Sequence, residues 1–105
     1  MIVILATVDK KTKALSIAKI LLRKRLVVCY NLIPINSGYW WKGKKAISKE
    51  TLMILKTKRQ NFAKVEKIIT EKSGYEVPEV LGIIPSKVSK PYLTWLLKET
   101  KPIKK

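Results

Sequence analysis

The order of hydrophobic patterns along the chain is the feature that most limits its fold. Continuous apolar or β-branched runs predict strands, whereas apolar residues spaced three and four apart predict amphipathic helices. Here the patterns follow one another as strand, helix, strand, strand, helix, strand and a short last helix. The strands are expected at 2–6, 26–35, 51–55 and 80–85, and the helices at 11–24, 61–72 and 89–98.

This order is that of the ferredoxin-like split βαβ arrangement, an α+β fold in which two helices cover one face of a four-stranded antiparallel sheet. A chain of 105 residues predicts one domain over 1–105, with a frayed basic tail at 101–105. Asp9 is expected to cap the first helix, and Pro91 to lie in the first turn of the last one. The second strand is expected to end near Pro34.

Two features of the predicted sheet indicate self-association. Within 26–35 both alternate sets of side chains are largely apolar, so the face without helices needs a cover. Ser37-Gly38 and Lys42-Gly43 flank the aromatic run Tyr39-Trp40-Trp41, which predicts an extended β-hairpin arm. Exposed apolar patches of this kind mark interfaces, and symmetric homo-oligomers are their commonest use.

Composition excludes several classes of function. The chain has no His, which removes His-based triads and HExxH zinc sites, and no phosphate-binding glycine-loop motif. Its one Cys excludes an internal disulfide and fits a reducing cytosol, and no apolar run is long enough for a membrane span. No nucleophile and base stand at a readable spacing, so the sequence predicts a protein that is not an enzyme. A signal peptide is not expected at the N-terminus, which lacks a basic region, and the predicted location is the cytoplasm.

The net charge of +16, from 23 Lys and Arg against 7 Asp and Glu, allows two interpretations. It could attract nucleic acid without sequence specificity, or it could be the Lys-rich surface of a thermophile-like protein. The lysines are dispersed through the chain, which favours the second interpretation. The central runs 2–5 and 52–55 carry no aromatic residue for stacking on bases, so no specific nucleic-acid partner is predicted.

Five spaced motifs occur in order along essentially the whole chain. They are Cys29-Tyr30-Asn31-Leu32-Ile33-Pro34; Ser37-x-Tyr39-x-Trp41-x-Gly43-Lys44; Glu50 with Leu52-Met53-Ile54-Leu55-Lys56-Thr57; Tyr75-Glu76-x-Pro78-Glu79; and Tyr92-Leu93-x-Trp95. Together they resemble the CutA family of divalent-cation tolerance proteins. The resemblance implies a ferredoxin-like homotrimer in the cytoplasm, a response to metal ions, copper binding, and a cleft between subunits for a metal ion or small ligand.

The sequence departs from the family pattern at two places. Ser73-Gly74 stands where the family usually has His-Pro, so the imidazole that could ligate a metal in the cleft is missing. The loop from Ser86 to Lys90 is shorter than in the family and lacks its glycine.

The candidate metal ligands are Cys29, Glu50 and Glu79, with copper or another divalent cation as the expected cofactor. A thiolate is the soft donor that Cu(I) prefers, and carboxylates bind divalent cations. The alternative is structural: Cys29 would be a small buried side chain, and each glutamate would pair with one of the many basic groups.

A ligand cleft is predicted at Lys44, Lys56, Tyr75 and Glu76, where the lysines could hold an anion by charge. Tyr39, Trp40 and Trp41 are predicted to pack the trimer interface, in which Tyr and Trp are common. The predicted function is therefore that of a CutA-like trimer in divalent-cation tolerance. The alternatives are a small-ligand signalling trimer and a nonspecific nucleic-acid binder.

Overall fold

The computed structural model describes residues 1–100 of the chain, so the predicted frayed tail, 101–105, lies outside the described residues. Its four strands form one antiparallel sheet in the order β2-β3-β1-β4. The strands are β1 (Ile2–Val8), β2 (Cys29–Trp41), β3 (Lys44–Thr57) and β4 (Val80–Ile83). The helices are α1 (Lys11–Arg23), a 3-10 turn η1 (Arg59–Asn61), α2 (Phe62–Lys72) and α3 (Lys90–Glu99).

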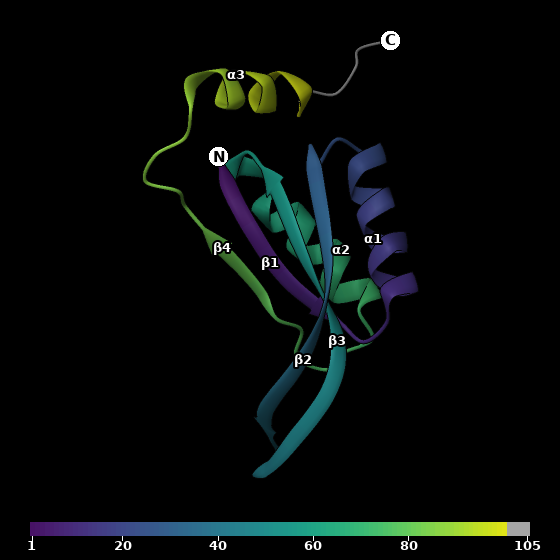
Figure 1. Ribbon diagram of the computed structural model, residues 1–105. Helices are drawn as coiled ribbons and strands as arrows, with labels where there is room; N and C mark the ends of the chain where they lie inside the picture. Colours follow the sequence, from purple (N-terminus) through teal and green to yellow (C-terminus); the bar gives the residue numbers. More distant parts are fainter. Residues whose placement is uncertain (101–105) are drawn as a thin grey trace.

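This architecture confirms the predicted ferredoxin-like α+β fold. Helices α1 and α2 cover one face of the sheet, whereas α3 lies beyond the end of the sheet where β1 begins (Figure 1). The core forms where the inward residues of the two central strands meet the two covering helices, because alternate strand residues point to one face. Its fully buried large side chains include Ile4, Met53, Leu55, Ile17, Leu21, Val65 and Ile69.

The hairpin formed by β2 and β3 is much longer than the predicted strands 26–35 and 51–55. Pro34 does not end β2; it lies within the strand, paired in register with Thr51 of β3. β2 is an edge strand with β3 as its one neighbour in the sheet, and a proline is tolerated there because its missing N–H can face away from the ladder. Residues 26–28 precede the strand instead of starting it: the amides of Leu26 and Val27 bond to the carbonyl of Leu21 at the end of α1.

Asp9 does not cap α1 as predicted. The N-cap residue is Lys10, which makes no side-chain capping bond, and Asp9 instead forms an ion pair with Lys13 one turn into the helix, at 3.0 Å. Pro91 lies in the first turn of α3, as predicted. The predicted hairpin arm is confirmed, but only Lys42-Gly43 forms its turn: both residues have positive φ (50° and 78°), as a two-residue type I′ turn requires, whereas Ser37-Gly38 lies within β2 and is paired with β3.

The face of the sheet opposite α1 and α2, which we call the open face, remains largely apolar within one chain. Register places side chains from all four strands on it: Val3, Leu5, Thr7, Cys29, Asn31, Ile33, Leu52, Ile54, Lys56, Leu81 and Ile83. Leu81 and Ile83 are 51% and 48% exposed, and Ile33 is 43% exposed. The structure thus retains the uncovered apolar face that the sequence predicted.

The hairpin projects beyond the two covering helices and gives the chain an elongated shape (Figure 1). The described chain measures 47 × 32 × 21 Å, and its radius of gyration is 14.6 Å, against about 13 Å for a compact chain of this length. None of the helices in residues 1–100 is long and apolar enough to cross a membrane.

Candidate functional site

The main pocket lies where the projecting hairpin passes the loop between α2 and β4. Its volume is about 670 Å³, within the range of small-molecule sites. Thr7 comes from the end of β1, and the other lining residues come from the hairpin and from the segment 74–79. They are Thr7, Ser37, Gly38, Tyr39, Trp40, Trp41, Glu50, Gly74, Tyr75, Glu76, Val77 and Glu79.

Ser73 and Gly74 shape the loop that brings Tyr75 to the pocket. Gly74 adopts φ +80°, the left-handed conformation that ends helices and that glycine adopts without strain. The hydroxyl of the buried Ser73 accepts a hydrogen bond from the amide of Tyr75 at 3.2 Å, and its carbonyl accepts one from Lys13 Nζ at 2.9 Å. Lys13 also holds Asp9, so the end of α2 is tied to the loop between β1 and α1.

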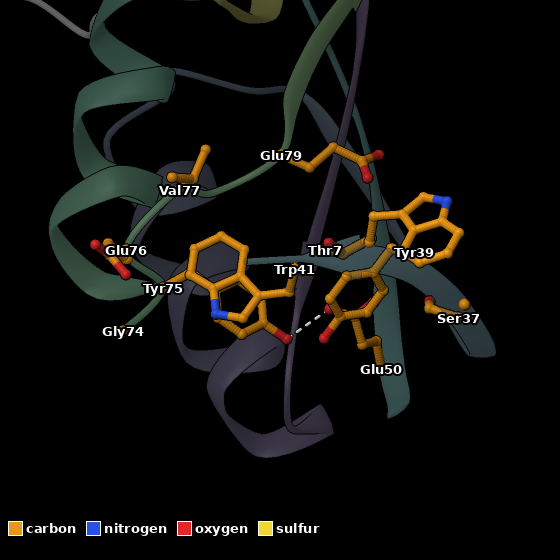
Figure 2. Close-up of a pocket in the computed structure, with 12 residues that line it drawn as sticks. Thr7, Ser37, Tyr39, Trp41, Glu50, Gly74, Tyr75, Glu76, Val77 and Glu79 are labelled. Atoms are coloured by element: carbon orange, nitrogen blue, oxygen red, sulfur yellow. Dashed lines mark hydrogen bonds between the residues drawn. The ribbon is translucent and has the colours of Figure 1, made fainter. Parts of the chain in front are cut away.

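Tyr75 and Glu50 join the two walls of the pocket. The Tyr75 hydroxyl donates to Glu50 Oε2 at 2.5 Å, which links the loop to β3 (Figure 2). Burial raises the pKa of Tyr75 above its ordinary value of 10.0, and the hydrogen bond and the charge of Glu50 raise it further. Tyr75 therefore remains a neutral donor at physiological pH, and the Glu50 carboxylate stays oriented into the pocket.

Aromatic rings form much of the hairpin wall of the pocket. Tyr39, Trp40 and Trp41 are 43%, 70% and 39% exposed within one chain, so they are available to a ligand or to a neighbouring subunit. Tyr39 and Trp41 lie on the open-face side of the hairpin, opposite Ala46 and Lys44, whereas Trp40 lies on the other side. The predicted role of the three in a trimer interface agrees with this exposure and remains a prediction.

The pocket is acidic in a chain that is strongly basic. Glu50, Glu76 and Glu79 are three of the seven acidic residues, and no Lys or Arg is among the lining residues of this pocket in the described part of the chain. Figure 2 shows the three carboxylates on separate sides of the pocket. The nearest basic partner is at the rim, where Lys42 Nζ lies 3.8 Å from Glu76 Oε2. The local charge therefore favours a cationic ligand, not the anion that the predicted lysines would hold.

The structure separates the predicted metal ligands within one chain. Cys29 is opposite Lys56 in the sheet, whereas Glu50 is opposite Ile35, six residues further along β2 or about 20 Å away. Glu79 lines the pocket with Glu50, but over residues 1–100 no three His, Cys, Asp or Glu side chains form a group that could hold a metal ion. The donor set of one chain therefore does not fit a metal centre by itself.

Of the predicted cleft residues, Tyr75 and Glu76 line the pocket and the two lysines do not. Lys56 lies on the open face beside Cys29 and donates to Asn31 Oδ1 at 3.2 Å, while Lys44 is beside the hairpin turn. Thr7 and Val77 are lining residues that the sequence analysis missed, and no motif distinguishes them. Ser37 and Gly38 were noted in the sequence as flanking the aromatic run, and Gly74 as part of a departure from the family pattern, but none of the three as a lining residue.

Comparison with known proteins gives a consistent assignment. The family model described as "CutA1 divalent ion tolerance protein" matches residues 2–99. The divalent-cation tolerance protein CutA of Pyrococcus horikoshii is 37% identical over 96% of this chain and 99% of its own. The structure superposes with a TM-score of 0.93 on CutA from Archaeoglobus fulgidus, which is described as periplasmic, at 33% identity over 96% of this chain and 100% of that one.

A further solved structure adds a different description of the same fold. CutA from Nostoc, described as a PII-like protein in its apo form, superposes with a TM-score of 0.89 at 27% identity over 96% of this chain and 98% of that one. The family match, the identities and the superpositions all extend over nearly the whole chain, and they agree with the motifs in its sequence. The chain belongs to the CutA1 divalent ion tolerance family.

Proposed function

We propose that this chain forms a cytoplasmic homotrimer that takes part in the response to divalent metal ions by binding a cation, without catalysing a reaction. The observation that carries the proposal is the charge of the pocket: three carboxylates line it, no basic residue does in the described chain, and the net charge is +16. A pocket of this sign concentrates cations locally even though the chain as a whole repels them.

The open face supports the trimeric part of the proposal. Of its exposed apolar residues, Ile33 is level with Thr7 of the pocket, whereas Leu81 and Ile83 are level with Leu5 and Val3, further from the pocket. Neighbouring subunits that cover this face and extend along the hairpin would also close the pocket. Leu81→Lys places a charge on the face, and we expect it to convert the trimer to monomers in light scattering after size exclusion. Leu22→Lys is the matched control, because Leu22 is 41% exposed on α1, on the covered side of the sheet. A trimer unaffected by Leu81→Lys would exclude this face from the interface.

A divalent cation, copper included, is the first ligand to test. Glu50 and Glu79 would supply carboxylate oxygens, and Cys29 a thiolate, with donors from more than one subunit because no single chain groups three of them. Calorimetric titration of the reduced protein with copper and zinc salts should show saturable binding that Glu50→Gln with Glu79→Gln weakens. Glu66→Gln with Glu71→Gln, on α2, makes the same charge change outside the pocket. Equal binding by the two double variants would exclude the pocket as the metal site.

A second candidate function is that of a small-ligand signalling trimer. The pocket volume of about 670 Å³ favours it, because that space is far larger than a coordinated ion needs. The description of the Nostoc protein as PII-like supports the same candidate function. The metal titration separates the two candidates. Saturable binding of Cu²⁺ or Zn²⁺ would favour the metal-response function, whereas a signalling pocket for an organic ligand does not need to bind either ion.

A further inference from the structure

The carboxylates of the pocket are under-neutralised for a chain with this many basic residues. Among residues 1–100, neither Glu50 nor Glu79 has an ion-pair partner, although the sequence holds 23 Lys and Arg. Glu50 instead takes its hydrogen bond from the neutral Tyr75 hydroxyl, which orients the carboxylate and leaves its charge in place. Two negative charges thus remain in a concave site, where a bound cation would offset them.

Four aromatic side chains also line the pocket: Tyr39, Trp40, Trp41 and Tyr75. The faces of Tyr and Trp rings attract cations through their quadrupole, and organic ammonium groups are the ligands that use such rings best. Because the carboxylates lie on separate sides of the pocket (Figure 2), the site offers ring faces and dispersed charge instead of a compact set of ligands. That combination suits a cation with an apolar body better than a bare metal ion.

Lys42 shows how such a group fits at the rim of the pocket. Its ammonium nitrogen lies 5.6 Å from the centroid of the Trp41 ring and 3.8 Å from Glu76 Oε2, and both residues line the pocket. The positive-φ turn at Lys42-Gly43 sets the position of this side chain beside the pocket. One ammonium of the chain itself therefore already makes the ring and carboxylate contacts that an ammonium ligand would make.

We infer that the pocket recognises a small organic ammonium ion, and that Lys42, at the rim, competes with this ion for Trp41 and Glu76. The inference rests on the proposed function, because it names the class of cation that the same pocket binds. A ligand that competes with an internal group binds more weakly by the fraction of molecules in which the site is free. Removing the Lys42 ammonium should therefore strengthen binding, although it takes away a group at the edge of the site.

The test titrates the full chain with n-butylammonium chloride at constant ionic strength and follows tryptophan fluorescence. A Trp95→Phe background leaves Trp40 and Trp41, both lining residues, as the fluorophores. We expect saturable binding, with 1-butanol, the neutral analogue, at least about fivefold weaker. Equal responses to the amine and the alcohol, or no response to either, would overturn the inference.

Two lysine variants in this background test the displacement of Lys42. Lys42→Met should bind the amine about threefold more tightly or better, because the internal competitor is gone. Lys44→Met removes the same charge two residues away, and its affinity should change less than about twofold, since the described structure gives Lys44 no ion pair. Equal tightening in both variants would reduce the effect to net charge and overturn the role of Lys42.

Glu79→Gln separates failure of this inference from failure of the proposed function. The variant should weaken amine binding, because it removes a pocket carboxylate without an ion-pair partner in the described chain. If copper or zinc binds in a Glu79-dependent way while the amine does not bind, the pocket remains a cation site and the ammonium class is wrong. If neither cation depends on Glu79, both proposals are wrong.

Discussion

Replacing Gly74 by alanine tests whether the loop that presents Tyr75 depends on a left-handed residue. At φ +80° an L-residue is strained by about 1–2 kcal/mol, whereas glycine is not. An added Cβ would also lie 3.0 Å from Lys13 Nζ. That ammonium cannot move away freely, because it is held by Asp9 at 3.0 Å and by the Ser73 carbonyl at 2.9 Å.

Gly38→Ala is the matched control for this substitution. Gly38 also lines the pocket, but it lies in extended β2, and an added Cβ meets nothing within 4 Å. Both substitutions remove the same backbone freedom from the unfolded chain, which stabilises by about 0.4–1 kcal/mol. That gain cancels in the comparison, so Gly74→Ala should be less stable than Gly38→Ala by about 1–2 kcal/mol, plus the cost of shifting Lys13.

The assay is equilibrium unfolding in guanidinium chloride, followed by far-UV circular dichroism at one fixed subunit concentration. The concentration must be fixed because the unfolding of an oligomer depends on it. A difference between the two variants of less than about 0.5 kcal/mol would refute the reasoning, since it would mean that position 74 tolerates a side chain as well as an extended strand does.

Three other perturbations have directions set by the structure. Leu55→Ala should lower the free energy of unfolding by about 2–5 kcal/mol, because Leu55 is fully buried in the core. A loss below about 1 kcal/mol in the same denaturation assay would contradict that burial. Burial and Glu50 raise the pKa of Tyr75, so the folded protein keeps a proton that the unfolded chain releases above about pH 10, and stability should fall as pH rises further. Tyr75→Phe should therefore lose less stability than the unsubstituted chain between about pH 10 and about pH 12, and should lack the last-titrating tyrosine in absorbance at alkaline pH. The hydrogen bond from Lys13 lowers the pKa of Asp9 below 3.8. The ionised Asp9 therefore stabilises the fold fully well above pH 3.8, and this stabilisation is lost as pH falls through the folded-state pKa. Lys13→Met should flatten the acid side of the stability profile, and an unchanged profile would contradict the coupling of the two residues.

Local patterns were sufficient to predict the order of elements, but not the length of the hairpin. The sequence indicated a break near Pro34, because proline removes a donor from the ladder. Strand β2 continues through Pro34 because it lies at the edge of the sheet, and the position of a strand within a sheet is a property of the assembled fold. Asp9 was a reasonable cap by residue type, but Lys13 one turn away attracts it instead.

The candidate site was predicted only in part, because its geometry also depends on the assembled fold. Tyr75, Glu76 and Glu79 were expected to be functional from their motif, and all three line the pocket. Lys56 was grouped with them from its motif as well, yet it lies at the other end of the hairpin, beside Cys29. Residue types and spacing do not give distances between strands, which depend on register.

The sequence by itself determined the fold class, the family and the uncovered apolar face, because hydrophobic periodicity and ordered motifs are local properties of the chain. Only the tertiary structure decided the sign and location of the site. The dispersed lysines suggested a basic protein throughout, but the register of β3 and the left-handed turn at Gly74 bring Glu50, Tyr75 and Glu79 to one pocket that no lysine lines in the described chain. Net charge is a sum over residues, whereas the field in a pocket depends on which side chains the backbone directs into it.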